Sequence, residues 1–317
     1  GTIYAAIDSR SGCPVALKRL HPLVADDPII AARFEREMVI LEKLSHPNIV
    51  RYHGGGSEDG RMFFAMELVS GGTLKQLLAT YQTLTWQEAI ACATQICSAL
   101  QHAHNHGIIH RDLKPANLYV GQAGELKIGD FGIARDLGEA DITSSGLTVG
   151  SHSYMSPEQI RGDTTVSEKT DLYALGCVLF EMLIGHAPFL GDNFAQLFEQ
   201  HLHTPPPRVR DFVADCPAEL DALITKLLAK SPDARPFNAR TVQATLLKIA
   251  EQHLPTAENS QDPAIMDQAR QFGRRELSNR VLGLTPEPAA DVSWVKLAAV
   301  FLLAAGLVAL AAFCQAN

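Results

Sequence analysis

The chain has 317 residues, of which 46% are hydrophobic, enough for one large domain or two ordinary ones with a sizeable core. The formal net charge of −8 argues against a general nucleic-acid-binding protein. Six cysteines are scattered along the chain without a CxxC pair, so we expect reduced thiols rather than a disulfide framework or a zinc site. No basic start followed by a long apolar run opens the chain, which argues against a signal peptide.

The first 70 residues are expected to form strands and one helix. Two short apolar runs, IYAAID at 3–8 and VALKRL at 15–20, are joined by the turn-like SRSGCP. The segment AARFEREMVILEKL at 31–44 has its apolar residues at helical spacing. MFFAMEL at 62–68 is another apolar run, and it is ended by SGG at 70–72.

Helices are expected to dominate from about residue 73 to residue 252. The segment 85–107 begins with a capping pattern, Thr85 followed by Glu88, and ends at Gly107. TDLYALGCVLFEMLIG at 170–185 is apolar nearly all round, which predicts a buried central helix. A long polar loop is expected at 134–156.

The last quarter of the chain has two different compositions. Residues 253–293 are rich in Pro, Gln, Asn, Ala and charge, which is typical of a linker. From Leu297 to Cys314 every residue is apolar or small, and such a helix is roughly 27 Å long, close to a ~30 Å hydrocarbon core. We therefore expect a transmembrane helix at 295–314, with a buried core helix as the alternative.

The charges around this span predict its orientation. Trp294 and Lys296 stand at its start, where an amphipathic ring and a long cationic side chain suit the interface. Arg274, Arg275 and Arg280 precede it, and no charge follows it. The positive-inside rule then places residues 1–296 in the cytoplasm of a single-pass membrane protein.

An ordered set of motifs runs through the first 250 residues. The set comprises VALK at 15–18, RFEREM at 33–38, HRDLKPAN at 110–117, DFG at 130–132 and SPE at 156–158. In this order it resembles the signature of a eukaryotic-like bacterial serine/threonine protein kinase of the membrane-anchored kind. Lys114, two residues after Asp112, favours the serine/threonine over the tyrosine class.

The resemblance implies an α+β, two-lobed protein kinase fold. The catalytic domain is expected at 1–252, with a small β-rich lobe that lacks its first strand and a large helical lobe. A juxtamembrane linker at 253–293 and the transmembrane helix at 295–314 would follow, in the bacterial cell (inner) membrane. The implied activity is ATP-dependent phosphorylation of Ser/Thr hydroxyls on proteins. The alternatives are a membrane-anchored pseudokinase scaffold that binds nucleotide and, third, a small-molecule phosphotransferase.

Phosphoryl transfer needs positioning and charge neutralisation more than covalent help from the protein. Asp112 is the candidate to accept the proton of the substrate hydroxyl, and Lys114 could reach the transferring phosphoryl group. Asn117 and Asp130 offer the oxygen ligands that Mg²⁺ prefers, with Mn²⁺ as an alternative. The tasks of Asp112, Lys114 and Asn117 explain why the segment 110–117 is so rich in polar and charged residues.

The resemblance also implies an ATP site. In the family, the lysine at the Lys18 position holds the α- and β-phosphates and pairs with a helix glutamate. Glu37 matches that glutamate, and Glu35 is the second candidate. The alternative is that Lys18 and the glutamate form only a surface salt bridge. The other implied ATP-binding positions are Gly1 and Ile3 of the glycine-rich loop, Ala16, the gatekeeper Met66, and the backbones of Glu67 and Val69. The loop's first two glycines are absent, so a truncated start is expected, or a kinase without this strand.

Further matches concern architecture and regulation. Asp171 is expected to hold the backbone of the catalytic loop, and Arg235 to pair with Glu158. Ser151 stands where the family usually has threonine, and Ser156 replaces the alanine of APE. Arg111 could clamp a phosphate in the activation segment. The expected phosphorylation sites are Thr143, Ser145 and, less favoured, Thr148, modified within a homodimer in trans; other partners are protein substrates.

Three histidines in QHAHNHG, at 102, 104 and 106, form the one other cluster of interest. A metal site is conceivable, but His104 should point away from the other two and no acidic partner is evident. We expect these histidines to be structural residues at the end of a long helix.

Overall fold

The computed structural model describes residues 2–20, 38, 41–58, 61–131, 152–163, 166–253 and 277–281. The remaining positions lie outside the described residues. They include the following predicted features: Gly1, Glu37, Ser151, the three phosphorylation sites and the span 295–314.

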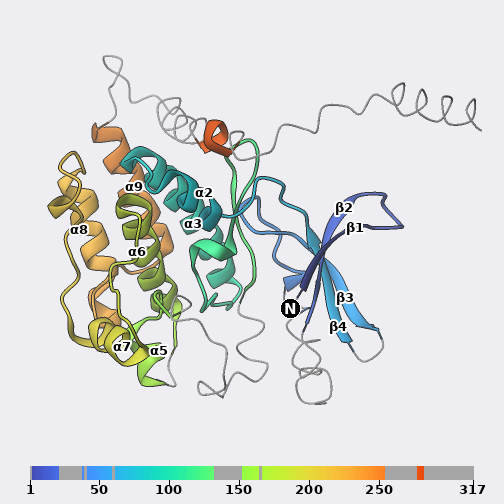
Figure 1. Ribbon diagram of the computed structural model, residues 1–317, viewed down its shortest axis with the longest axis horizontal. Coiled ribbons are helices and arrows are strands. Elements are labelled where there is room, and N and C mark those ends of the chain that lie inside the picture. Colours follow the sequence, from blue (N-terminus) through green and yellow to red (C-terminus); the bar gives the residue numbers. More distant parts are fainter. Residues whose placement is uncertain are drawn as a thin grey trace, which may run out of the picture.

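The N-terminal part is an antiparallel four-stranded sheet with the order β1-β2-β4-β3 (Figure 1). Its strands are β1 (Thr2–Ile7), β2 (Pro14–Arg19), β3 (Tyr52–Glu58) and β4 (Arg61–Glu67). The Asp8 side chain closes the turn between β1 and β2, because it accepts hydrogen bonds from the Arg10 backbone and the Ser11 hydroxyl. A small apolar cluster of Ala16, Met38, Val50, Met62, Phe64 and Met66 lies against this sheet.

Helices make up most of the second part, as the sequence predicts. They are α2 (Leu74–Tyr81), α3 (Trp86–Asn105), α5 (Pro157–Arg161), α6 (Glu168–Ile184), α7 (Phe194–His203), α8 (Ala218–Leu227) and α9 (Ala239–His253). Within the described residues, three short 3₁₀ helices, Pro115–Asn117, Val209–Asp211 and Pro232–Ala234, join them. A hairpin of β5 (Leu118–Val120) and β6 (Leu126–Ile128) lies between the sheet and the helices in Figure 1.

The two strongest helix predictions are confirmed. The Thr85 and Glu88 capping box opens α3, and Gly107 with φ +73° follows its end. Helix α6 is buried from Thr170 to Phe180 without a break, because neighbours cover it on every side. The large core cluster therefore belongs to the helical lobe, and the sheet has its own smaller cluster.

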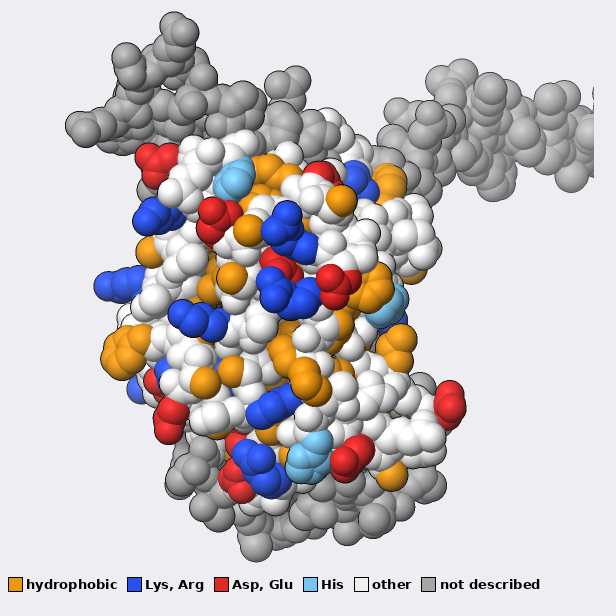
Figure 2. All heavy atoms as spheres, turned by 90° about the vertical axis from the view of Figure 1, so that its left-hand side faces the viewer, with side chains coloured by type: hydrophobic (Ala, Val, Ile, Leu, Met, Phe, Trp, Pro, Cys, Tyr) orange, Lys and Arg blue, Asp and Glu red, His pale blue; other side chains and the backbone are white. Residues whose placement is uncertain are grey.

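The surface of the helical lobe opposite the sheet mixes both signs of charge (Figure 2). Lys and Arg side chains there alternate with Asp and Glu side chains. Within the described ranges, no helix is both long enough and apolar enough to cross a membrane. A short helical turn at 277–281 packs on the helical lobe, inside the stretch predicted as a linker.

Candidate active site

The loop His110–Asn117 is fastened to helix α6 by one buried carboxylate. Asp171 accepts the backbone N–H groups of His110 and Arg111, each at 2.9 Å. Arg111 has a left-handed backbone with φ +64°, which is costly for a residue with a side chain. The two bonds from Asp171 hold the chain in this turn. The structure thus places Asp171 where the sequence expected it.

The expectation that His104 lacks an acidic partner is wrong. Its Nε2 lies 2.7 Å from the Oδ2 atom of Asp171, and both side chains are buried. Burial by itself would raise the pKa of Asp171, but the interactions with His104 and, to a smaller extent, with His110 outweigh it and hold that pKa below its ordinary value. His104 therefore supports the carboxylate that anchors the loop.

The other two histidines of that helix end form a different group. The rings of His102 and His106 lie 4.6 Å apart, and the His46 ring lies 5.1 Å from that of His102. Burial lowers the pKa of His46 and His102, so both favour the neutral form. Among the residues that the structure describes, no group of three or more His, Cys, Asp or Glu side chains is placed to bind a metal.

Asp112, Lys114 and Asn117 come together on this loop. Lys114 Nζ lies 2.8 Å from the Asp112 carboxylate. The Asn117 side-chain amide donates to the Asp112 carbonyl at 2.8 Å and to its carboxylate at 3.1 Å. Because the Asn117 nitrogen is used in this way, its side-chain oxygen is the atom left for a cation.

The second acidic residue, Asp130, lies beside this loop. Gly129 donates its N–H to the Asn117 carbonyl at 3.0 Å, and its own carbonyl lies 3.0 Å from His110 Nε2. Asp130 also has a left-handed backbone, with φ +51°. Its carboxylate pairs with Lys18 and accepts a 3.4 Å hydrogen bond from Tyr119. The predicted partner of Lys18, Glu37, lies outside the described residues.

Strand register places four of the residues predicted to bind the nucleotide on one face of the sheet. Ile3 lies opposite Lys18, and Ala16 lies opposite Met66. Since side chains alternate along a strand, Ala16 and Lys18, two residues apart, lie on the same face of the sheet. Residues directly opposite each other also share a face, so the four side chains lie on one side. The N–H of Glu67 already donates to the Arg51 carbonyl at 2.8 Å, so this N–H is not available to a ligand. Val69 follows and packs against the small cluster.

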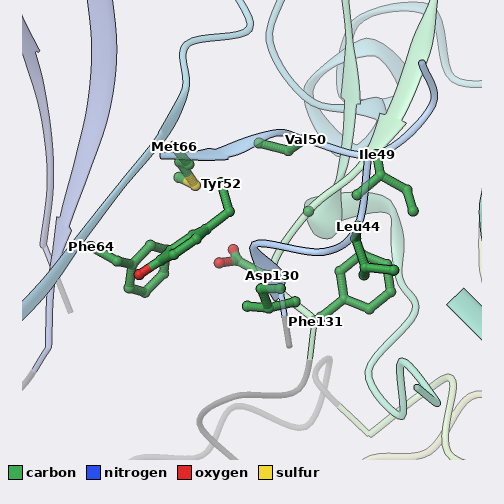
Figure 3. Close-up of a pocket in the computed structure, with 10 residues that line it drawn as sticks. Leu44, Ile49, Val50, Tyr52, Phe64, Met66, Asp130 and Phe131 are labelled. Atoms are coloured by element: carbon green, nitrogen blue, oxygen red, sulfur yellow. The ribbon is translucent and has the colours of Figure 1, made fainter. Parts of the chain in front are cut away.

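A small cavity lies behind Met66. Tyr52, Phe64 and Met66 from the sheet face Asp130 and Phe131 across it (Figure 3). Its volume of about 30 Å³ suits a water molecule and is far too small for a nucleotide. The cavity is therefore a packing gap between the sheet and the DFG motif.

Helix α5 is tied to the helical lobe by a buried ion pair. Arg235 forms two parallel bonds to the Glu158 carboxylate, at 2.7 and 2.8 Å, with both side chains at most 3% exposed. The hydroxyl of Thr170 donates to the same carboxylate at 2.8 Å. Burial alone would raise the pKa of Glu158, but Arg235 outweighs it, so the pKa lies below its ordinary value.

Two contacts of α5 were missed at the level of sequence. The side chain of Ser156, which replaces the alanine of APE, caps α5 in a capping box with Gln159. Gln159 also donates to the backbone carbonyl of Arg111 at 2.8 Å. The Ser-x-x-Gln spacing could have revealed the cap, but no local pattern indicates the second contact. Through it, α5 touches the catalytic loop directly.

The oxygen atoms of Asn117 and Asp130 fit a hard divalent cation. Mg²⁺ usually takes one or two protein ligands and completes its octahedron with phosphates and water. An amide and a carboxylate on adjoining loops match that requirement, and a softer metal would favour sulfur or imidazole. Mg²⁺ with a nucleotide therefore suits this pair of side chains.

The comparisons with known proteins agree with this geometry. The family described as "Protein kinase domain" matches residues 1–247. Serine/threonine-protein kinase PknB of Mycolicibacterium smegmatis is 38% identical over 261 residues, covering 80% of this chain and 42% of PknB.

Two solved structures also resemble the chain, each with a TM-score of 0.62. The PknI kinase domain of Mycobacterium tuberculosis is 28% identical and is matched over 78% of this chain and 90% of its own. Rad53 in complex with AMP-PNP is 30% identical, with 76% and 60% covered. The chain spans about two fifths of the length of PknB. It belongs to the protein kinase family and carries a kinase domain of the serine/threonine type.

Proposed function

We propose that this protein transfers the γ-phosphoryl group of ATP to serine and threonine hydroxyls of protein substrates. The observation that carries the proposal is the loop on which Asp112 contacts both Lys114 and Asn117 while Asp171 holds its backbone. Family membership and the names of the relatives support the reaction type.

Each side chain of the loop has a distinct proposed task. The Asp112 carboxylate accepts the proton of the acceptor hydroxyl, and Asn117 fixes its orientation through the 3.1 Å bond. Lys114 brings a positive charge to the place where negative charge develops. ATP would supply the phosphoryl group, and Mg²⁺ would neutralise its charge. Asn117 and Asp130 would hold the cation, and Lys18 would contact the phosphates.

The described conformation keeps Lys18 and Asp130 paired with each other. The proposed tasks differ: Lys18 contacts phosphates and Asp130 contacts the cation. The pair must therefore separate before the reaction, and the two charges keep each other neutralised until then. Their presence, with that of Asp112 and Asn117, favours an active kinase over a pseudokinase scaffold.

Membrane anchoring and regulation belong to the same proposal. The apolar stretch 295–314 supports a single span, with the kinase domain on the cytoplasmic side of the cell (inner) membrane. Thr143, Ser145 and Thr148 are proposed autophosphorylation sites, modified in trans within a homodimer. Arg111 is the proposed phosphate partner, because it directly precedes Asp112 on the catalytic loop.

The test is the variant Asp112→Asn in the full chain, purified in detergent and incubated with labelled ATP and Mg²⁺. Loss of a general base should reduce transfer by a factor of about 10² to 10⁴ and leave nucleotide binding nearly unchanged. Asp163→Asn is the matched control, because Asp163 is an exposed carboxylate of the same lobe, paired with Arg161 at 3.3 Å. Transfer at the parent's rate by Asp112→Asn would show that this carboxylate is not the base.

A further inference from the structure

The short turn at 277–281 is buried against the helical lobe, although its composition is that of a linker. Leu277 and Val281 are both fully buried and belong to the large core cluster. They stand four residues apart on a helical turn, so they share one face. In Figure 1 this turn, at the red end of the colour scale, lies beside α2 and the β5–β6 hairpin. The core of the kinase domain thus takes up the Leu277 and Val281 side chains of this turn.

Between these two residues, Arg280 enters a site built for a guanidinium group. Its Nε and Nη2 atoms lie 2.7 and 2.9 Å from the two carboxylate oxygens of Glu88. Its Nη1 donates to the Thr83 carbonyl at 3.2 Å, and its Cζ atom lies 4.9 Å from the centre of the Tyr81 ring. The Tyr81 hydroxyl donates to the Arg280 carbonyl at 2.9 Å. The forked, planar shape of arginine suits all these contacts, and an ammonium group does not.

Glu88 connects this arginine to the start of α3. Its side chain is 3% exposed and also accepts the Thr85 backbone N–H at 2.7 Å in the capping box. A carboxylate this deeply buried needs a positive partner or several hydrogen bonds. Arg280 supplies the charge, and the capping box supplies the remaining bonds. The ion pair therefore contributes to α3 as well as to the docked turn.

The same turn touches the segment that joins the two lobes. Gly71 lies two residues after Val69, and an added Cβ there would overlap the Val120 carbonyl and the Val281 side chain. The Ser278 hydroxyl donates to the Gln122 carbonyl at 2.6 Å, next to β5. The docked turn thus closes over the end of the connection between the lobes.

We infer that Tyr81, Thr83 and Glu88 form an arginine socket, an intramolecular docking site for the turn Leu277–Val281 of the same chain. The socket binds the Arg280 side chain, and the large core cluster on either side of it takes up the Leu277 and Val281 side chains. The docking fastens the stretch after α9 to the kinase domain at the point where its lobes are joined.

One consequence concerns the reach of the domain, and it rests on the membrane span proposed above. Without docking, residues 254–294 would separate α9 from the span; with docking, residues 282–294 would separate the docked turn from the span. Thirteen residues extend at most about 45 Å, against about 140 Å for the longer stretch. The socket would therefore keep the kinase domain close to the membrane surface.

Hydrogen exchange of residues 277–281 in the full chain tests the docking without relying on kinase activity. The variants are Glu88→Gln, Arg280→Gln and the double variant; glutamine at 88 can still complete the capping box. Each single change should speed exchange about tenfold, and the double variant should be no faster than the worse single one, because both remove one interaction. Arg240→Gln, an exposed arginine on α9, should leave exchange unchanged.

Two results would overturn the inference. Exchange at 277–281 that is unchanged in both single variants would mean that Arg280 does not hold the turn. Protection that rises with protein concentration would mean that the socket takes the turn of a second copy. Protection independent of concentration, with coupled effects of the two substitutions, supports docking within one chain.

Discussion

Replacing Arg235 by leucine should destabilise the helical lobe more than any exposed arginine substitution. Its guanidinium is fully buried, binds both oxygens of Glu158, and donates to the carbonyls of Lys169 and Ala229 at 2.8 and 2.9 Å. Arg235→Leu removes all of these donors and leaves a buried carboxylate without its cation.

The expected magnitude follows from the cost of an unpaired buried charge. Breaking a buried ion pair by removing one partner costs about 3–5 kcal/mol, and unsatisfied carbonyls add to it. We expect about 4 kcal/mol, a large part of the 5–15 kcal/mol that usually stabilises a domain. The double variant Arg235→Leu/Glu158→Leu should recover part of the loss, because no charge remains buried.

Urea denaturation followed by circular dichroism measures this effect. Arg161→Leu is the control, because Arg161 and Asp163 form an exposed pair at 3.3 Å, worth at most about 1 kcal/mol. If Arg235→Leu and the control lose the same free energy of unfolding, the argument that burial makes the Arg235–Glu158 pair important is refuted.

The pH dependence gives an independent check on the same pair. The pKa of Glu158 is lowered in the folded state, so the unfolded chain binds more protons as the pH falls. The stability from this group is present above the ordinary pKa of 4.5 and is lost as the pH falls through the lower folded value. The difference in free energy of unfolding between the parent and Arg235→Leu/Glu158→Leu should therefore decrease as the pH falls below about 4.5.

Three further outcomes are expected. Burial lowers the pKa of His201 to about 3, below its ordinary 6.5, so folding stability should fall as the pH drops from about 6.5 toward 3; His201→Gln should flatten this slope in thermal melts across that range. His104→Leu should loosen the catalytic loop and slow phosphoryl transfer about tenfold with little change in nucleotide affinity, whereas equal rates would show that Asp171 needs no support. Chelating divalent cations should stop transfer without shifting the thermal melt, because the proposed ligands Asn117 and Asp130 lie outside the two apolar clusters.

The sequence alone determined the features that depend on neighbouring residues. The capping box at Thr85 and the buried character of α6 follow from local spacing, and the structure shows both. The order of HRDLKPAN, DFG and SPE indicated the family, because these motifs carry the chemistry within a few residues each. The contacts of Asp171 and Arg235 came from resemblance rather than from spacing.

Only the tertiary structure decided which distant side chains meet. His104 and Asp171 are 67 residues apart, and Arg280 and Glu88 are 192 residues apart. A single sequence shows that such residues are charged, but not which elements the packed core brings together. Arg280 was therefore interpreted as one of several basic residues near a membrane. The burial of Leu277 and Val281 against the helical lobe is what places it on Glu88.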